Sequence, residues 1–191
     1  KLEVRGVTLR QGSLIWELAP ADQPSRPLAI TNLTVALRFL PGNEWSLDNL
    51  AADYAGLRLQ ASGRIAHATA LRDWPVFQGR TKQPPEVTLA RLRRLQDTLD
   101  QIRFTRPPVI RVMLSGDAER LETFGGGITL ETVGAVTPWG DFQNAGLRVY
   151  LKPAKPDSSH SAEINLAAEH ASTKWGALRK LDLSLMATRH T

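Results

Sequence analysis

The feature that most constrains the fold is an alternation of apolar and polar side chains, with a period of two residues, through most of the chain. Successive side chains of a strand point to opposite faces, so this period indicates strands that bury one face only. Turn-forming residues such as Pro41-Gly42-Asn43 separate the alternating segments. The pattern predicts about ten strands. The clearest lie at residues 33–39, 57–65, 110–114, 147–151, 164–168 and 181–185.

Near the start of the chain, two short alternating runs occupy residues 2–9 and 14–16. Gln11-Gly12 lies between them, and glycine is common in the turns that join neighbouring strands. We therefore expect residues 2–16 to form a hairpin that turns at Gln11-Gly12.

One segment, residues 86–103, has a helical period instead. Its leucines recur at steps of three and four, Pro84-Pro85 suits a helix start, and Pro107-Pro108 ends it. We expect this helix to cap the sheet; the alternative is an amphipathic helix at a membrane surface, although its polar face is mixed in charge. The residues expected to make the cap are Leu92, Leu95, Leu99 and Ile102.

The helix divides the chain into a first set of strands at residues 1–80, a helical insertion or cap at 81–107, and a second set of strands at 108–191. The second set contains a repeat, since Ala135-Val-Thr-Pro-Trp-Gly140 is echoed 36 residues later by Ala171-Ser-Thr-Lys-Trp-Gly176. A fixed period of this length indicates repeated supersecondary units, which predicts two similar hairpins at 135–151 and 171–187. Because the chain begins at Lys1 inside an alternating run, we expect the whole chain to be a segment of a longer protein.

Residue types that carry chemistry occur without the spacing that chemistry needs. There are no cysteines, which excludes disulfides and thiolate metal sites. None of the four histidines has another at a ligand spacing of three or four residues. Gly125-Gly126-Gly127 lacks the Lys-Ser/Thr of a phosphate loop. We therefore expect no enzymatic activity, no catalytic residues, no metal and no cofactor.

The net charge of +5 is carried mainly by arginine, with 18 arginines and 6 lysines. A basic chain can bind nucleic acid or anionic lipid. These arginines are scattered rather than gathered into a dense tract, so we expect no nucleic-acid partner. The five tryptophans at 16, 45, 74, 139 and 175 could stack on sugars, but we interpret them as core anchors or plugs at strand ends.

Several stretches share one cadence, namely Leu2–Leu14, Leu28–Leu37, Trp45–Leu50, Gly56–Gly63, Val112–Asp117 and the two Trp-Gly hairpins. Through these stretches the chain resembles, over nearly its whole length, the AsmA-like family, which includes the TamB-type proteins of Gram-negative envelopes. The predicted helix at 86–103 interrupts the run of strands, which is a departure from that cadence.

The resemblance implies an extended, strongly curved antiparallel sheet, shaped like a gutter, with one amphipathic helix. Its concave face would be apolar and hold the acyl chains of phospholipid. The protein would be periplasmic, anchored to the inner membrane through regions outside this chain, and would take part in lipid transport and outer-membrane biogenesis, with membrane or envelope proteins as partners at either end. The residues expected to line the groove are Val35, Leu37, Leu59, Val112, Leu130, Val149, Leu166 and Leu183.

The alternation agrees with this implication on one point, because many strands carry a single apolar face and one helix is too little to cover them. An open gutter would leave that face for lipid. A β-sandwich would bury it against a second sheet. The sandwich would point to an adhesion or carbohydrate-binding module, and a structural spacer is a third alternative.

Overall fold

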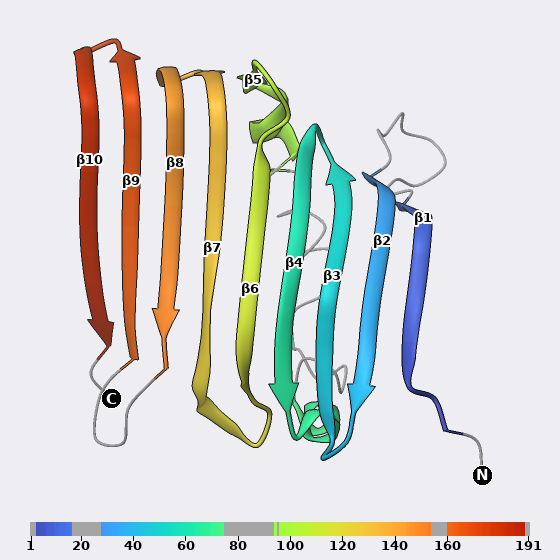
Figure 1. The fold of residues 1–191 in the computed structure, drawn as a ribbon. Helices are drawn as coiled ribbons and strands as arrows, with labels where there is room; N and C mark the ends of the chain where they lie inside the picture. The colour runs from blue at the N-terminus through green and yellow to red at the C-terminus, as the bar shows by residue number, and fades with distance from the viewer. Residues whose placement is uncertain (1–2, 17–27, 75–93, 95, 154–159, 190–191) are drawn as a thin grey trace.

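The computed structural model describes residues 3–16, 28–74, 94, 96–153 and 160–189. These residues form one ten-stranded sheet, drawn in Figure 1. Its elements are β1 (Gly6–Trp16), β2 (Leu28–Leu40), β3 (Glu44–Tyr54), β4 (Leu57–Ala66), the 3₁₀ helix η1 (Ala68–Asp73), β5 (Arg103–Phe104), β6 (Val109–Asp117), β7 (Arg120–Thr137), β8 (Gly140–Lys152), β9 (His160–Thr173) and β10 (Gly176–Arg189).

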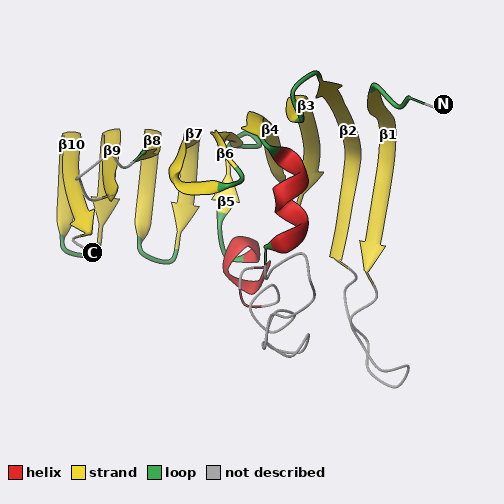
Figure 2. Cartoon of the chain, turned by 90° about the horizontal axis from the view of Figure 1, so that it is seen from below, coloured by secondary structure: helices red, strands yellow, loops and turns green. Residues whose placement is uncertain are grey.

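The strands lie in the order β1-β2-β3-β4-β6-β7-β8-β9-β10, and the short β5 pairs with the end of β7. Every neighbouring pair is antiparallel except β4 and β6, which run parallel. A parallel pair needs a crossover connection, because the chain must return to the end at which the first strand began. This crossover begins with η1 and includes helical residues at 94 and 96–100. Figure 2 shows both helical pieces on one side of the sheet.

The sheet is open and curved, which confirms the predicted fold class. The β-sandwich alternative requires a second sheet, whereas all the strands in the described ranges belong to one. The packed interior is correspondingly thin. Among the described residues, the buried apolar side chains are mostly alanines, with Leu57 and Pro108 as the larger members. No helix in this part of the chain is long and apolar enough to cross a membrane.

The predicted hairpin at Gln11-Gly12 is wrong. Residues 6–16 form the single strand β1, which pairs along its length with β2. Gln11 has a left-handed backbone with φ of 55°, and the register shifts on either side of Gly12. One left-handed residue makes a bulge that kinks a strand without reversing it. Gln11-Gly12 therefore interrupts the ladder, and the chain continues in the same direction.

The predicted helix ends earlier than expected. The helical residues reach Asp100, and Arg103 already lies in β5, where it pairs with Val136 of β7. The end of the predicted helix, before Pro107-Pro108, therefore pairs with β7 instead of forming a last helical turn. Leu99 and Ile102 are half-buried. Leu92, Leu95 and the rest of the predicted helix before Arg94 lie outside the described residues.

The sequence repeat is also a repeat of backbone conformation. Gly140 and Gly176 have φ of 152° and 149°, and four residues after each, Asn144 and Lys180 are left-handed, with φ of 46° and 57°. At this level one register pair is missing from each of three successive strand pairs. The missing pairs are Val133–Asn144, Asn144–Glu169 and Glu169–Lys180. The Asn144 side-chain amide donates a hydrogen bond to the Glu169 carboxylate. The two hairpins therefore share a kink at the same height.

The left-handed position at Lys180 predicts a stabilising substitution. A left-handed backbone costs a residue with a Cβ about 1–2 kcal/mol, and glycine avoids that cost. Lys180→Gly should therefore raise the free energy of unfolding by roughly 1 kcal/mol in urea denaturation. The matched control is Arg179→Gly on the same strand, which is not among the left-handed residues. That change should destabilise the sheet, since glycine weakens a regular strand. Equal effects at both positions would contradict the prediction.

Candidate functional site

The register of the strand pairs aligns apolar residues into a row that crosses nine strands. Each member is the register partner of the next, so all of their side chains point to the same side of the sheet. No polar residue interrupts the row. From β1 to β10 it consists of Leu9, Val35, Leu50, Ala61, Val112, Ile128, Val149, Ile164 and Leu185.

Two further rows flank this one on the same side and contain only apolar residues and glycine. One consists of Val7, Leu37, Leu47, Gly63, Leu114, Gly126, Leu151, Ala162 and Ala187. The other consists of Ala52, Leu59, Ile110, Leu130, Leu147, Leu166 and Leu183. We call the three rows together the apolar face. With strands about 4.8 Å apart, it extends about 38 Å across the sheet.

All eight residues predicted to line a groove lie on the apolar face. Val35, Val112 and Val149 belong to the central row, Leu37 to one flanking row, and Leu59, Leu130, Leu166 and Leu183 to the other. Arg58, Arg111 and Arg148 occupy the alternate positions of their strands and face the other way. The structure thus brings the predicted set together; whether the set binds lipid stays a prediction.

The apolar face is largely open. Of its three rows, only Ala52 is buried, and the others are half-buried or exposed. Ile128 is 46% exposed and Leu185 is 53% exposed. A contiguous apolar surface of this kind is unusual on a soluble monomer, and such surfaces are in general associated with interaction sites.

Part of the apolar face is hollowed between β2, β3, β4 and β6. The hollow has a volume of about 300 Å³, at the lower end of the range for small-molecule pockets. Gly63 lies in its floor, where a Cβ atom would approach the carbonyl oxygen of Leu114 to 2.2 Å. The hollow is lined by Leu37, Trp45, Leu47, Ala61, Ser62, Gly63, Ile65, Val112 and Leu114.

Aromatic side chains close the apolar face at the end where η1 lies. The rings of Trp74 and Phe124 meet edge to face, with centroids 5.4 Å apart, and Trp74 Nε1 donates to the carbonyl oxygen of Ala118 at 3.1 Å. Phe124 lies over Gly116, since a Cβ at Gly116 would come within 2.6 Å of its ring. A second edge-to-face pair, Phe39 with Trp45, lies nearby on β2 and β3.

Next to these aromatic side chains, the Asp117 carboxylate links the start of η1 to the turn between β6 and β7 through hydrogen bonds. Its carboxylate accepts hydrogen bonds from the His67 ring at 2.8 Å, from the Glu119 backbone N–H at 3.0 Å and from the Arg120 guanidinium at 3.0 Å. Burial alone would raise the pKa of Asp117, but these hydrogen bonds hold it below its usual value. The hydrogen bond to Asp117 and the negative charges of Asp117 and Glu119 raise the pKa of His67.

Sequence reasoning missed this cluster, because His67 and Asp117 lie far apart in the chain and share no motif spacing. Metal-binding atoms of His67, Asp117 and Glu119 lie within 4.8 Å of one another. The Asp117 carboxylate, however, already accepts four hydrogen bonds, two of them from the arginine cation. The arrangement therefore suits a structural clasp between η1 and the β6–β7 turn better than a cation site.

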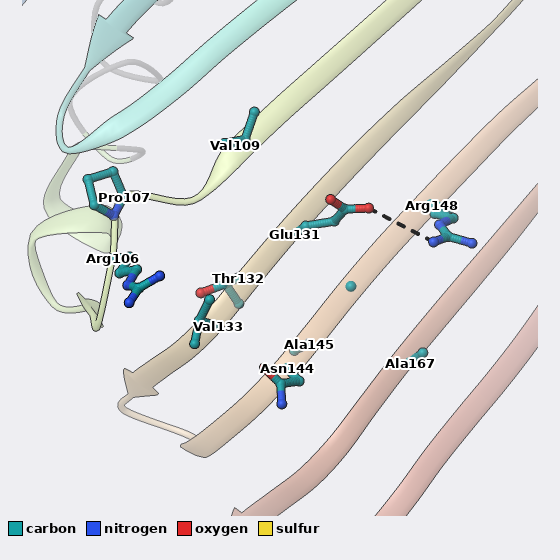
Figure 3. A pocket seen from close by; sticks show the side chains of 11 residues that line it. Arg106, Pro107, Val109, Glu131, Thr132, Val133, Asn144, Ala145, Arg148 and Ala167 are labelled. Atoms are coloured by element: carbon teal, nitrogen blue, oxygen red, sulfur yellow. Dashed lines mark ion pairs between the residues drawn. The ribbon is translucent and has the colours of Figure 1, made fainter.

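The opposite face carries cross-strand ion pairs. Glu131 lies 3.0 Å from Arg111 and 3.9 Å from Arg148, and Arg38 pairs with Asp48. An open depression on this face has a volume of about 420 Å³. Figure 3 shows Arg148 and Glu131 on one side of it and Arg106 on the other. The carboxylate of Glu131 is half exposed and shared by two arginines, so this face is a solvated surface whose ion pairs contribute little to stability.

The tryptophans fall into two groups. Trp45 and Trp74 pack against phenylalanines, as expected for anchors. Trp139 and Trp175 are 57% and 78% exposed at the tips of two hairpins, so the interpretation as core anchors is wrong for these two. The side chain of Trp16 lies outside the described residues.

Comparisons with family models, curated proteins and solved structures gave no match to this chain.

The Asp117 clasp predicts a pH-dependent stability. The raised pKa of His67 means that protonation favours the folded state, so this contribution is full below the ordinary histidine pKa of about 6.5 and is lost as the pH rises through the higher folded value. The lowered pKa of Asp117 gives a contribution present above about pH 4 and lost in acid. The clasp should therefore stabilise most between about pH 4 and pH 6.5.

Thermal unfolding of the parent and of His67→Gln at pH 6 and pH 8 tests this expectation. The difference in Tm between the two proteins should be larger at pH 6 than at pH 8, because only the parent gains a protonated partner for Asp117. A difference in Tm that is equal at both pH values, or larger at pH 8, would show that the ion pair does not couple to folding.

Proposed function

We propose that this chain is a non-catalytic lipid-binding segment that holds the acyl chains of phospholipid against its apolar face. The observation that carries the proposal is the central row, which crosses nine strands from Leu9 to Leu185 without a polar residue. An acyl chain is flexible and apolar and has no hydrogen-bonding groups. A continuous apolar row can therefore contact it, and remove it from water, along its whole length.

The energetics of the sheet favour an apolar occupant. Burying a valine, leucine or isoleucine fully is worth roughly 1.5–3 kcal/mol, and the open face leaves part of that contribution unrealised. Acyl chains laid over Ile128, Val149 and their row partners would supply the missing contacts. Phospholipid headgroups would remain at the rim of the face, in contact with water.

The direction of the rows indicates how lipid would lie and move. The rows run across the strands, so a chain lying along them passes from one strand to the next over side chains of nearly equal polarity. Successive positions would then be similar in free energy, and an acyl chain could slide along the rows without crossing a polar barrier. A conducting role in transport between membranes, as the AsmA-like resemblance implies, extends this binding role, with the periplasm as its setting.

The two other candidate functions lack a comparable observation. The adhesion or carbohydrate-binding module rested on a sandwich, and the described strands form one sheet. A spacer would need no accessible apolar surface, whereas Leu185 and Ile128 are about half exposed. The lipid-binding proposal therefore accounts for the open apolar face, which neither alternative requires.

A pair of neighbouring substitutions tests the proposal. Ile128 belongs to the central row, while Thr129 faces the other side between Arg111 and Arg148. Ile128→Glu should abolish the phospholipid that co-purifies with the chain, because a carboxylate would be desolvated against the acyl chains. Thr129→Glu introduces the same charge near two arginines and should leave the lipid content unchanged. Mass spectrometry of solvent extracts measures both.

Stability supplies a second readout of the same proposal. Lipid that binds the folded chain alone adds about 2.7 kcal/mol at a hundredfold excess over Kd, so delipidation should lower the Tm of the parent. Circular dichroism confirms that each variant is folded, and Leu185→Glu on β10 replaces Ile128→Glu if the latter unfolds. A parent without lipid, or a folded central-row variant that carries lipid like the parent, would show that the proposal is wrong.

A further inference from the structure

Two turns of the same design lie side by side at one end of the sheet. Thr137-Pro-Trp-Gly140 joins β7 to β8, and Thr173-Lys-Trp-Gly176 joins β9 to β10, at the top of Figure 1. Thr173 is the register partner of both Gly140 and Gly176, so the two turns are at equal height. Two strand spacings separate them, which is about 10 Å. We call these two turns together the docking tip.

The turns hold their tryptophans out from the sheet. Thr137 Oγ1 accepts hydrogen bonds from the backbone N–H groups of Trp139 and Gly140, both at 3.1 Å. Thr173 Oγ1 accepts the matching bond from the Trp175 N–H at 3.2 Å. Each threonine hydroxyl also donates to the carbonyl oxygen of the glycine. The same side-chain clamp therefore fixes both turns, while the indole rings remain 57% and 78% exposed.

The charged side chains around the β9–β10 turn are positive, since residues 170–180 contain Lys174, Arg179 and Lys180 and no carboxylate. The matching interval of the β7–β8 turn, residues 134–144, contains one charged residue, Asp141, so three cations outnumber one carboxylate around the two turns. Lys174 Nζ lies 4.6 Å from the centroid of the Trp175 ring, a cation–π geometry that keeps an ammonium group beside the exposed indole. The docking tip thus presents flat amphipathic rings together with cations.

We propose that the two tryptophan turns dock the chain on the headgroup region of an anionic phospholipid bilayer. Indole rings favour that region because they are apolar in body and carry one N–H donor, and basic side chains are attracted to anionic headgroups. Two rings about 10 Å apart on clamped turns engage the bilayer together without ordering a flexible segment. The choice of a bilayer as partner rests on the proposed lipid-binding function, to which the docking tip would bring a source or an acceptor of lipid.

Vesicle co-sedimentation tests the docking tip. Vesicles of phosphatidylcholine with about 30% phosphatidylglycerol should bind the parent chain. The double variant Trp139→Ser, Trp175→Ser should bind at least about tenfold more weakly, because both interfacial rings are lost. The double variant Trp139→Tyr, Trp175→Tyr should retain most of the binding, since tyrosine also favours the interface. Lys174→Glu should weaken binding to these vesicles and leave binding to pure phosphatidylcholine unchanged.

Three outcomes of the vesicle experiment would overturn the docking role of the tryptophan turns. The proposal is wrong if the parent does not bind vesicles, or if the serine variant binds as the parent does. It is also wrong if Lys174→Glu abolishes binding while the serine variant keeps it, because charge alone would then drive association. Equal Tm values of the parent and the serine variant show that a loss of binding does not come from unfolding.

The same proteins separate this proposal from the lipid-binding function. Ile128→Glu should bind vesicles like the parent and lose co-purified phospholipid. The serine double variant should keep co-purified phospholipid and lose vesicle binding. Failure of the first pattern refutes acyl binding by the apolar face, and failure of the second refutes docking by the turns.

Discussion

The cross-strand register of the backbone ladder is the constraint on which the rest of the structure depends. Side chains alternate between faces along every strand, so a slip of one residue between two neighbours would turn the apolar set of one strand to the other face of the sheet. The register holds across eight successive interfaces, including the parallel pair β4–β6, where Ala61 meets Val112. Bulges in β2 and β3 absorb the extra residues and return Val35 and Leu50 to alignment. Continuity of the apolar face is thus a property of backbone pairing.

A sheet with one layer places unusual demands on its few packed clusters. The hydrogen-bonded ladder is continuous, but most large apolar side chains remain half-open, and the buried set consists mainly of alanines. The aromatic closure around Trp74 and the Asp117 clasp therefore tie the crossover to the sheet where other contacts are scarce. Both lie at one end of the central strands, away from the exposed tryptophan turns. The contacts that hold the crossover on the sheet therefore lie at one end of the strands, and the exposed tryptophan turns lie at the other.

The strands and their faces could be predicted from sequence because a period of two is a local property. All eight predicted groove residues therefore fell on one face, and the offset between the two Trp-Gly segments indicated a repeated hairpin. Local patterns were less informative where conformation depends on distant contacts. Gln11-Gly12 has turn composition, yet pairing with β2 keeps β1 extended. Arg103 ends a segment with a helical period, yet it lies in β5 and pairs with Val136. The clasp joins residues 67 and 117, a contact for which no short-range pattern exists.

The missing register pairs at Asn144, Glu169 and Lys180 divide the sheet into two regions. Three successive strand pairs lack a pair at one height, so the ladder is interrupted along a line across β7 to β10. The Asn144–Glu169 hydrogen bond bridges this interruption between β8 and β9, and β5 pairs with β7 beyond it. Both tryptophan turns lie on that side of the line and all three apolar rows lie on the other, so a substitution in one region leaves the register of the other intact.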